Sequence, residues 1–374
     1  MIDTQKDLES VCDRAKSASA IAIDTEFVWN RTYYPKLGVI QLGINENDCH
    51  LIDADAIVDL SALGSLISDP DIQKILHDAQ QDLAIIRRVT GAFPRNIFDT
   101  RCAAGIAGIG STCSLASLIE EILGVTLDKS ETRTDWLKRP LTNEQIRYAI
   151  EDVSYLHATR ALLTERIAKM GRSDWLVEEL ANYDEPHQYT ERDPRLQYER
   201  VKGIGRSAPR DRAIARELAA WREDEARRRD RPRSHILTDE TILKLAKLAP
   251  KTIEDIKAVR GAGKRDLIAI QKHIQSGVEV PDADCPRRRR HKRLIDDDTF
   301  DKLLHKSMKV LRDQCELHGL DAPFVASRAE VRSLLYSFIE DIDEPLPITQ
   351  GWRANIAGKH IIELLLKAKI KTLR

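Results

Sequence analysis

Long apolar runs, paired cysteines and a leader-like N-terminus are all missing from this chain of 374 residues. No window approaches about 18 uninterrupted apolar residues, so we expect no membrane span. The first residues, MIDTQKDLES, contain neither a basic nor an apolar region, so we expect no secretory signal. The six cysteines form no C-x-x-C pair. That excludes a disulfide scaffold or a zinc module and predicts a reducing, cytoplasmic location.

The composition is that of a folded protein with more than one domain. Apolar residues make up 42% of the chain and charged residues 32%, which excludes a disordered or fibrous protein. At about 150 residues per domain, the length predicts two or three domains.

The net charge of −1 is a sum over two unlike halves. Residues 1–190 hold 19 basic and 30 acidic residues, a balance of −11, whereas residues 191–374 hold 40 and 30, a balance of +10. This asymmetry predicts separate tasks, with metal binding in the acidic half and polyanion binding in the basic half.

Apolar runs typical of strands alternate with helical patterns up to about residue 170. The runs 19–28, 37–44 and 49–53 read as strands, and the polar turn between the last two favours a hairpin. Residues 142–169 have a helical pattern, in which Thr142 and Gln145 have the spacing of a capping box. The alternation predicts an α/β domain with a mixed sheet.

Beyond residue 190 only helical patterns are found. They cover 211–229, 239–248, 253–259, 264–275, 296–318, 328–340 and 354–370. The proline- and arginine-rich stretch 281–293 is typical of a linker, and it predicts two small all-α modules on either side.

Acidic residues stand at three places where chemistry is plausible. Asp24 and Glu26 alternate at the end of a strand and therefore share one face. Asp82 begins a helical pattern, and Tyr148 and Asp152 lie four residues apart on one helical face. Taken alone, each signal has a plainer explanation, namely a solvated acid pair, a helix N-terminal acid and a packing tyrosine.

As a set, the acids have a stronger interpretation. Four converging carboxylates cannot all stay ionised without cations. Hard oxygen ligands favour Mg²⁺ or Mn²⁺ over zinc. Two such ions can activate a water and stabilise the leaving oxygen of a phosphodiester.

These segments resemble the bacterial ribonuclease D family over essentially the whole chain. The similar segments are AIDTEFVWNRTYYPKLGVIQL (22–42), LHDAQQDL (76–83), IFDT (97–100) and LDKSETRTDWLKRPLTNEQIRYAIEDVSYL (127–156). The resemblance implies a ribonuclease H-like DEDD exonuclease that shortens RNA from its 3′ end with two divalent cations, Mg²⁺ or Mn²⁺.

By motif, the resemblance implies that Asp24, Glu26, Asp82 and Asp152 are the catalytic metal ligands. It also implies that Tyr148 orients the attacking water, because the tyrosine subclass has Tyr four residues before the last Asp. The histidine subclass has His five residues before it, where this chain has Arg147.

One departure concerns the second motif. The family often has Ala directly after the motif histidine, and this chain has Asp78 there. Asp78 competes with Asp82 for the ligand role, and we prefer Asp82 because Leu83 follows it as in the motif.

Substrate contacts are predicted for Phe27, His77 and a basic run in the linker. Phe27 could stack on the terminal base or pack in the core, and these readings are evenly balanced. For His77 we favour slightly a structural role over substrate contact. The run consists of Arg287, Arg288, Arg289 and Arg290, and few acids lie near it, which favours RNA contact.

The helical modules are similar to HRDC domains. The signatures are Trp221-Arg222 and Pro232 in the first, and Ser327-Arg328, Gly351-Trp352-Arg353 and Gly358 in the second. We read Trp221 as a core anchor. Arg227, Arg228 and Arg229 either bind RNA or pair with the acids at 223–225. The predicted domains are 1–190, 200–280 and 294–374, with 281–293 as linker.

The expected function is a cytoplasmic 3′→5′ exoribonuclease that releases 5′-mononucleotides. The resemblance implies trimming of structured RNA with a single-stranded 3′ end, such as tRNA precursors, and we favour a monomer. One alternative is a DNA exonuclease of the same subclass. Another is a non-catalytic RNA-binding protein, which would be expected to have lost a ligand. The chain has no P-loop, so it is not a helicase of that type.

Overall fold

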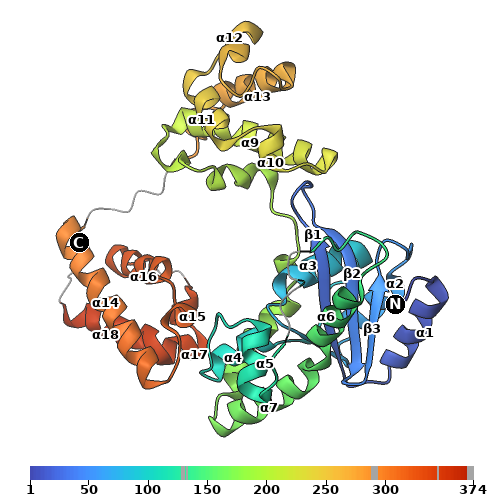
Figure 1. Cartoon of the computed structure of the whole chain (residues 1–374). Helices are drawn as coiled ribbons and strands as arrows, with labels where there is room; N and C mark the ends of the chain where they lie inside the picture. The colour runs from blue at the N-terminus through green and yellow to red at the C-terminus, as the bar shows by residue number, and fades with distance from the viewer. Residues whose placement is uncertain (128–130, 132–133, 288–293, 343–344, 369–374) are drawn as a thin grey trace. The chain divides into compact units, whose positions relative to one another are not determined.

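The computed structural model describes residues 1–127, 131, 134–287, 294–342 and 345–368. By its internal contacts the chain forms two compact units (Figure 1). The first unit comprises residues 1–26, 37–189 and the C-terminal segment from 291. The second unit comprises residues 27–36 and 190–290. None of the described helices has the length and apolar composition that a membrane span requires.

A five-stranded mixed sheet organises the α/β part of the chain (Figure 1). The strands are β1 (Ala20–Val28), β2 (Lys36–Asn45), β3 (Asp48–Asp53), β4 (Gln73–Leu76) and β5 (Ile97–Asp99), in the order β3-β2-β1-β4-β5. The parallel pairs are β1 with β4 and β4 with β5, whereas β2 and β3 are antiparallel. The predicted mixed sheet and hairpin are therefore confirmed.

Helices cover both faces of this sheet, because successive side chains of a strand point alternately into two different cores. Ile21 and Ile23 of β1 pack with α1 (Gln5–Ala15), α2 (Ser61–Ser68) and α3 (Gln80–Thr90). Ala20 and Ala22 face the other way, towards a second core. That core includes residues of α4 (Thr100–Ile106), α5 (Leu115–Leu123), α7 (Leu156–Lys169) and α8 (Ser173–Ala181).

The helical pattern predicted over 142–169 is two helices rather than one. The first is α6 (Asn143–Ser154), and Tyr155 separates it from α7. The predicted capping box of Thr142 and Gln145 is present at the start of α6. Both helices bury apolar residues, so the hydrophobic spacing continues across Tyr155 and does not reveal the break.

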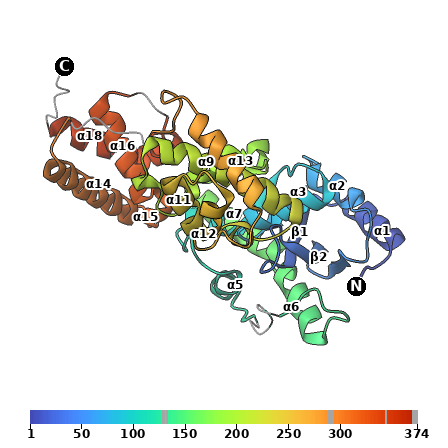
Figure 2. The ribbon, with the colours of Figure 1, turned by 90° about the horizontal axis from the view of Figure 1, so that it is seen from above.

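The second unit is built around two long helices that pack together, α9 (Pro209–Arg229) and α13 (Leu267–Glu279) (Figure 2). A Cβ added at Gly277 would lie 2.4 Å from the Cα of Ile214, so the close approach requires glycine. Trp221 packs against this core and stacks on His273, as predicted for a core anchor. The shorter elements are η3 (Pro194–Arg200), η4 (Ile204–Arg206), α10 (Arg233–Ile236), α11 (Asp239–Leu248) and α12 (Ile253–Ala258).

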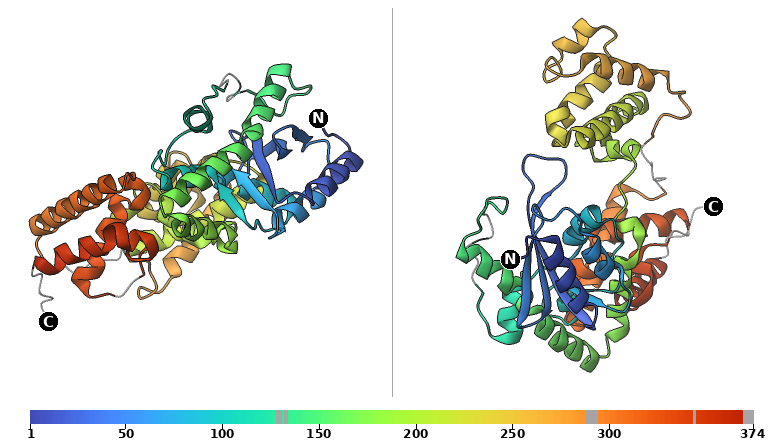
Figure 3. Two further views of the ribbon diagram at one scale, coloured as in Figure 1. Left: turned by 90° about the horizontal axis from the view of Figure 1, so that it is seen from below. Right: turned by 90° about the vertical axis from the view of Figure 1, so that its right-hand side faces the viewer.

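The C-terminal helices lie together as one group of the first unit (Figure 3), and their buried side chains form a separate apolar core. Its elements are α14 (Asp297–Leu317), α15 (Ala322–Val325), α16 (Arg328–Glu340), η5 (Pro347–Thr349), α17 (Gly351–Arg353), the π-helical turn Ala354–Gly358 and α18 (Lys359–Lys367). Trp352 is buried and donates its indole N–H to Glu179 of α8 at 2.8 Å, and Arg353 pairs with the same carboxylate. Beyond residue 190 the described part of the chain contains no strand, as predicted.

Candidate active site

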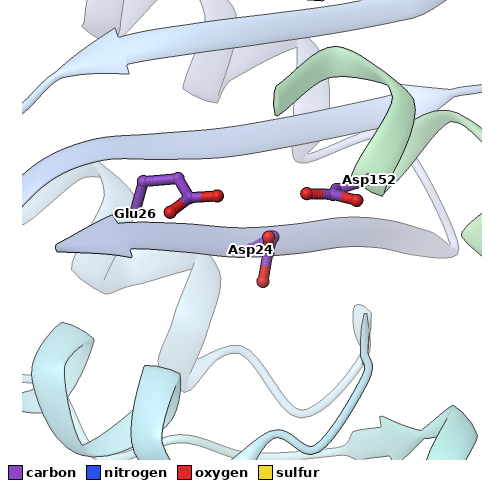
Figure 4. Close-up of side chains that lie close together, drawn as sticks. All are labelled: Asp24, Glu26 and Asp152. Carbon is purple, nitrogen blue, oxygen red and sulfur yellow. The ribbon is translucent and has the colours of Figure 1, made fainter. Parts of the chain in front are cut away.

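Three of the predicted carboxylates come together beside β1, the middle strand of the sheet. Asp24 and Glu26 lie on this strand, and Asp152 reaches it from α6 (Figure 4). One oxygen from each lies within 4.8 Å of the others, and all three side chains are half-buried. Period-two alternation explains why Asp24 and Glu26 share a face.

The cluster is electrostatically strained when no cation is present. Burial, followed by the charges of Asp82, Asp152 and Glu26, raises the pKa of Asp24 well above its usual value. Burial and the charges of Asp152 and Asp82 raise the pKa of Glu26 to about 8. Burial raises the pKa of Asp152 to about 7. These carboxyls therefore retain protons near neutral pH unless positive charge replaces them.

Asp82 lies beside this cluster, in the first turn of α3, and it is buried. It is not among the three acids whose oxygens all approach one another, but its charge raises the pKa of both Asp24 and Glu26. The hydroxyl of Thr25 donates a hydrogen bond to its Oδ1. Burial raises the pKa of Asp82 itself to about 6.

The competing residue Asp78 is engaged elsewhere. Its side chain is 64% exposed and forms an ion pair with Arg101. Its backbone has a positive φ of 58°, and its amide donates to the carboxylate of Asp99. This geometry favours Asp82 over Asp78 as the fourth acid.

Tyr148 stands one helical turn before Asp152 on α6. A hydrogen bond from Tyr148 lowers the pKa of Asp152 and so partly offsets the effect of burial. The ring of Trp136 packs against Tyr148 with 6.0 Å between centroids. Trp136 is itself buried, and a Cβ added at Gly38 would lie 2.4 Å from its carbonyl oxygen.

Sequence reasoning did not identify Thr25 and Trp136 as parts of this site. Thr25 lies between the two acids of β1, where strand alternation predicts that it points away from them. Trp136 lies outside the helices and strands, so no periodic spacing relates it to Tyr148. The available signal was the position of both residues inside the motif segments quoted above.

The predicted substrate contacts are placed as follows. Phe27 is half-buried on β1. The two ring nitrogens of His77 lie 2.9 Å from the hydroxyl of Thr100 and 3.1 Å from the carbonyl of Cys113. These contacts suit the structural role that we favoured. Arg287 is exposed, and Arg288, Arg289 and Arg290 lie outside the described residues.

The donor set fits a hard divalent cation. All the clustered ligand atoms are carboxylate oxygens, which Mg²⁺ and Mn²⁺ prefer, and the group contains no histidine or cysteine. Burial and then mutual repulsion raise the pKa values of these acids, and a bound cation would offset both by stabilising the ionised carboxylates.

Comparison with known proteins agrees with this geometry. The sequence model of a 3′-5′ exonuclease family matches residues 1–168, and that of the HRDC domain matches residues 211–270. Ribonuclease D of Desulfotalea psychrophila is 37% identical over 94% of this chain and 95% of its own length. Ribonuclease D of Acidiphilium cryptum is 35% identical over 97% of this chain and 92% of its own.

A solved structure shows the same architecture. The crystal structure of Escherichia coli RNase D superposes with a TM-score of 0.87 at 30% identity and covers 98% of both chains. That relative is described as an exoribonuclease involved in structured RNA processing. With a mixed-sheet exonuclease domain, an HRDC domain and these full-length relatives, the chain belongs to the ribonuclease D family of 3′→5′ exoribonucleases.

Proposed function

We propose that Asp24, Glu26, Asp82 and Asp152 hold two divalent cations, Mg²⁺ or Mn²⁺, and that the chain releases 5′-mononucleotides from RNA 3′ ends. The observation that carries the proposal is the approach of three carboxylate oxygens within 4.8 Å, with pKa values raised by burial and mutual repulsion. Such a cluster needs compensating positive charge to stay ionised.

The protein's own groups have distinct tasks in this reaction. Bound cations would supply the charge that activates the attacking water and stabilises the leaving oxygen. The hydroxyl of Tyr148 orients the attacking water beside Asp152. The hydroxyl of Thr25 holds the carboxylate of Asp82 in one orientation, and Trp136 fixes the ring of Tyr148 by packing. Preorganised groups of this kind need little rearrangement during the reaction.

We propose structured RNA with a single-stranded 3′ end, such as a tRNA precursor, as the substrate. The E. coli relative is described as acting in structured RNA processing, and the HRDC domain lies in the half of the chain with a surplus of basic residues. Phe27, His77 and the run Arg287–Arg290 remain proposed contacts.

We also propose the functional division 1–190, 200–280 and 294–374, with the linker 281–293 and a second HRDC-like domain at the C-terminus. The separate apolar core of the C-terminal helices supports this division. Their attachment to α8 through Trp352 and Arg353 supports a role in stabilising the exonuclease domain.

The test is to incubate the purified protein with a 5′-labelled RNA that has a single-stranded 3′ tail. We expect shortening from the 3′ end with Mg²⁺ or Mn²⁺ and none with a chelator. Asp24→Asn should abolish the reaction, whereas Asp55→Asn, which removes an exposed acid of the same unit, should not. An active Asp24→Asn protein would refute the metal site, and faster cleavage of a matched DNA would favour a DNA exonuclease.

A further inference from the structure

The second unit contains a cavity of about 660 Å³ that the proposed chemistry does not use. One side is formed by the β1–β2 loop, residues 29–35, with Trp29 and Tyr33. The other side is formed by the helical module, with Arg200, Arg222 and Arg233. All the lining residues belong to the second unit, so this unit alone defines the cavity.

The loop that forms one wall is firmly attached to the helical module. The backbone amides of Tyr33 and Tyr34 both donate to Oδ1 of Asp230, at 3.0 and 3.1 Å. The hydroxyl of Tyr33 donates to the buried carboxylate of Glu223, and the guanidinium of Arg233 lies 4.9 Å from the Tyr33 ring. These contacts fix the shape of the wall before any ligand binds.

Trp29 offers an exposed aromatic surface in this wall. The residue is 55% exposed, more than any other tryptophan among the described residues. Its indole N–H donates to the carbonyl of Tyr33 at 3.0 Å, which restrains the ring. A restrained indole with its donor already satisfied is suited to stacking on a flat apolar group such as a nucleobase.

The charges around the cavity favour an anionic ligand. Its two acids are already paired: Asp239 with Arg222 at 2.7 Å, and Glu240 with Lys244 at 2.6 Å. Arg200 is exposed, and its guanidinium makes no hydrogen bond or ion pair with any residue that the structure describes. The cavity therefore combines an exposed aromatic ring with an uncompensated cation.

Covalent connectivity limits the separation between Trp29 and the proposed metal ligand Glu26. Trp29 is three residues after Glu26 in the chain. At no more than about 3.6 Å per residue, their Cα atoms are separated by at most about 11 Å. A nucleotide bound at Trp29 would thus lie only a few nucleotides from the bond being hydrolysed.

We propose that this cavity is a subsite for one nucleotide of the single-stranded 3′ tail, with its base stacked on Trp29 and a neighbouring phosphate contacting Arg200. The inference rests on the proposed function, which supplies the RNA. Every base can stack on an aromatic ring, and a single arginine that contacts a phosphate does not distinguish one base from another. The subsite therefore binds single strands without sequence preference.

The experiment measures binding of fluorescently labelled oligoribonucleotides by anisotropy, in chelator so that no hydrolysis occurs. Trp29→Ala should weaken binding of a long single strand roughly 5- to 150-fold, and Trp29→Phe should recover most of the loss. Arg200→Gln should reduce the slope of log K against log salt by about 0.7, the value for one phosphate contact on a single strand. Arg206→Gln is the matched control, because Arg206 is also an exposed arginine of the same module and lies outside the cavity.

Three results would overturn the subsite. The first is that Trp29→Ala binds a long single strand as tightly as wild type. The second is that Arg200→Gln and Arg206→Gln change the salt slope equally. The third is that Trp29→Ala weakens binding of a dinucleotide, which is too short to span both sites, as much as binding of the long strand. The proposed function is judged separately by RNA shortening in Mg²⁺. A chain that binds as described but never shortens RNA would refute the proposed function and not the subsite.

Discussion

Replacing Glu26 with glutamine should make the metal-free protein less sensitive to alkaline pH, even though it damages the catalytic site. In the folded chain the pKa of Glu26 is about 8, against an ordinary value of 4.5. A carboxyl with a raised folded-state pKa stays protonated when the unfolded chain has already lost its proton. The protonated group therefore adds to the free energy of unfolding in full below pH 4.5, and this contribution is lost as pH rises towards about 8.

The size of the effect follows from the shift and from the exposure of the side chain. One pKa unit corresponds to about 1.4 kcal/mol, so an isolated group with this shift would contribute at most ~5 kcal/mol. Glu26 is half-buried, so solvent screens part of its charge, and its shift is shared with Asp152 and Asp82. We therefore expect wild type to lose ~2 kcal/mol more than Glu26→Gln between about pH 5 and about pH 8.

Urea unfolding in chelator, followed by circular dichroism at both pH values, measures this difference directly. Titrations outside the acidic cluster are common to both proteins and cancel, whereas loss of the Glu26 charge also lowers the pKa of Asp24, which acts in the same direction. Excess Mg²⁺ should remove most of the pH dependence of wild type, since bound cations replace the protons. Parallel pH profiles for the two proteins in chelator would refute the electrostatic account of the site.

Three further changes test packing contacts in three different parts of the chain. Gly277→Ala should cost about 1–3 kcal/mol in thermal unfolding, because its Cβ would meet the α9 backbone, whereas Gly205→Ala, with open space around it, should cost less. Trp136→Ala should lower kcat more than it raises KM in RNA hydrolysis, since the ring that restrains the catalytic tyrosine is lost; an unchanged kcat would contradict this. Glu179→Ala leaves a mostly buried arginine unpaired and should expose the C-terminal helices to limited proteolysis, with a cost of about 3–5 kcal/mol; an unaltered digestion pattern would show that this contact is dispensable.

Local patterns predicted much of the fold because local physics decides those features. The alternation in β1 places Ile21 and Ile23 on one core and the two acids on a shared face. The capping box at Thr142 is a contact within a single helical turn, so its spacing is visible in the sequence. The bounds of α11 and α16 agree with the predicted ranges 239–248 and 328–340.

Other features depend on contacts between distant residues and leave no periodic trace. Thr25 and Asp82 are 57 residues apart, so their hydrogen bond appears only after folding. The arginine cluster at 227–229 had two interpretations. The structure resolves them, because Arg227 pairs with Glu223 and the next two arginines pair with Glu225. Much of the basic surplus of this helix is therefore neutralised within the module.

The anchoring of the β1–β2 loop by Asp230 and Glu223 has a consequence for how the protein can be divided. The chain passes between the two units four times, after residues 26, 36, 189 and 290. A fragment ending near residue 190 would keep the loop but lose the carboxylates that hold it. Tyr33 would then lose its buried partner, directly downstream of the catalytic strand. Activity measured on such a fragment would be that of a chain whose β1–β2 loop is not anchored. The shortest fragment suitable for kinetic measurements therefore includes the first helical module.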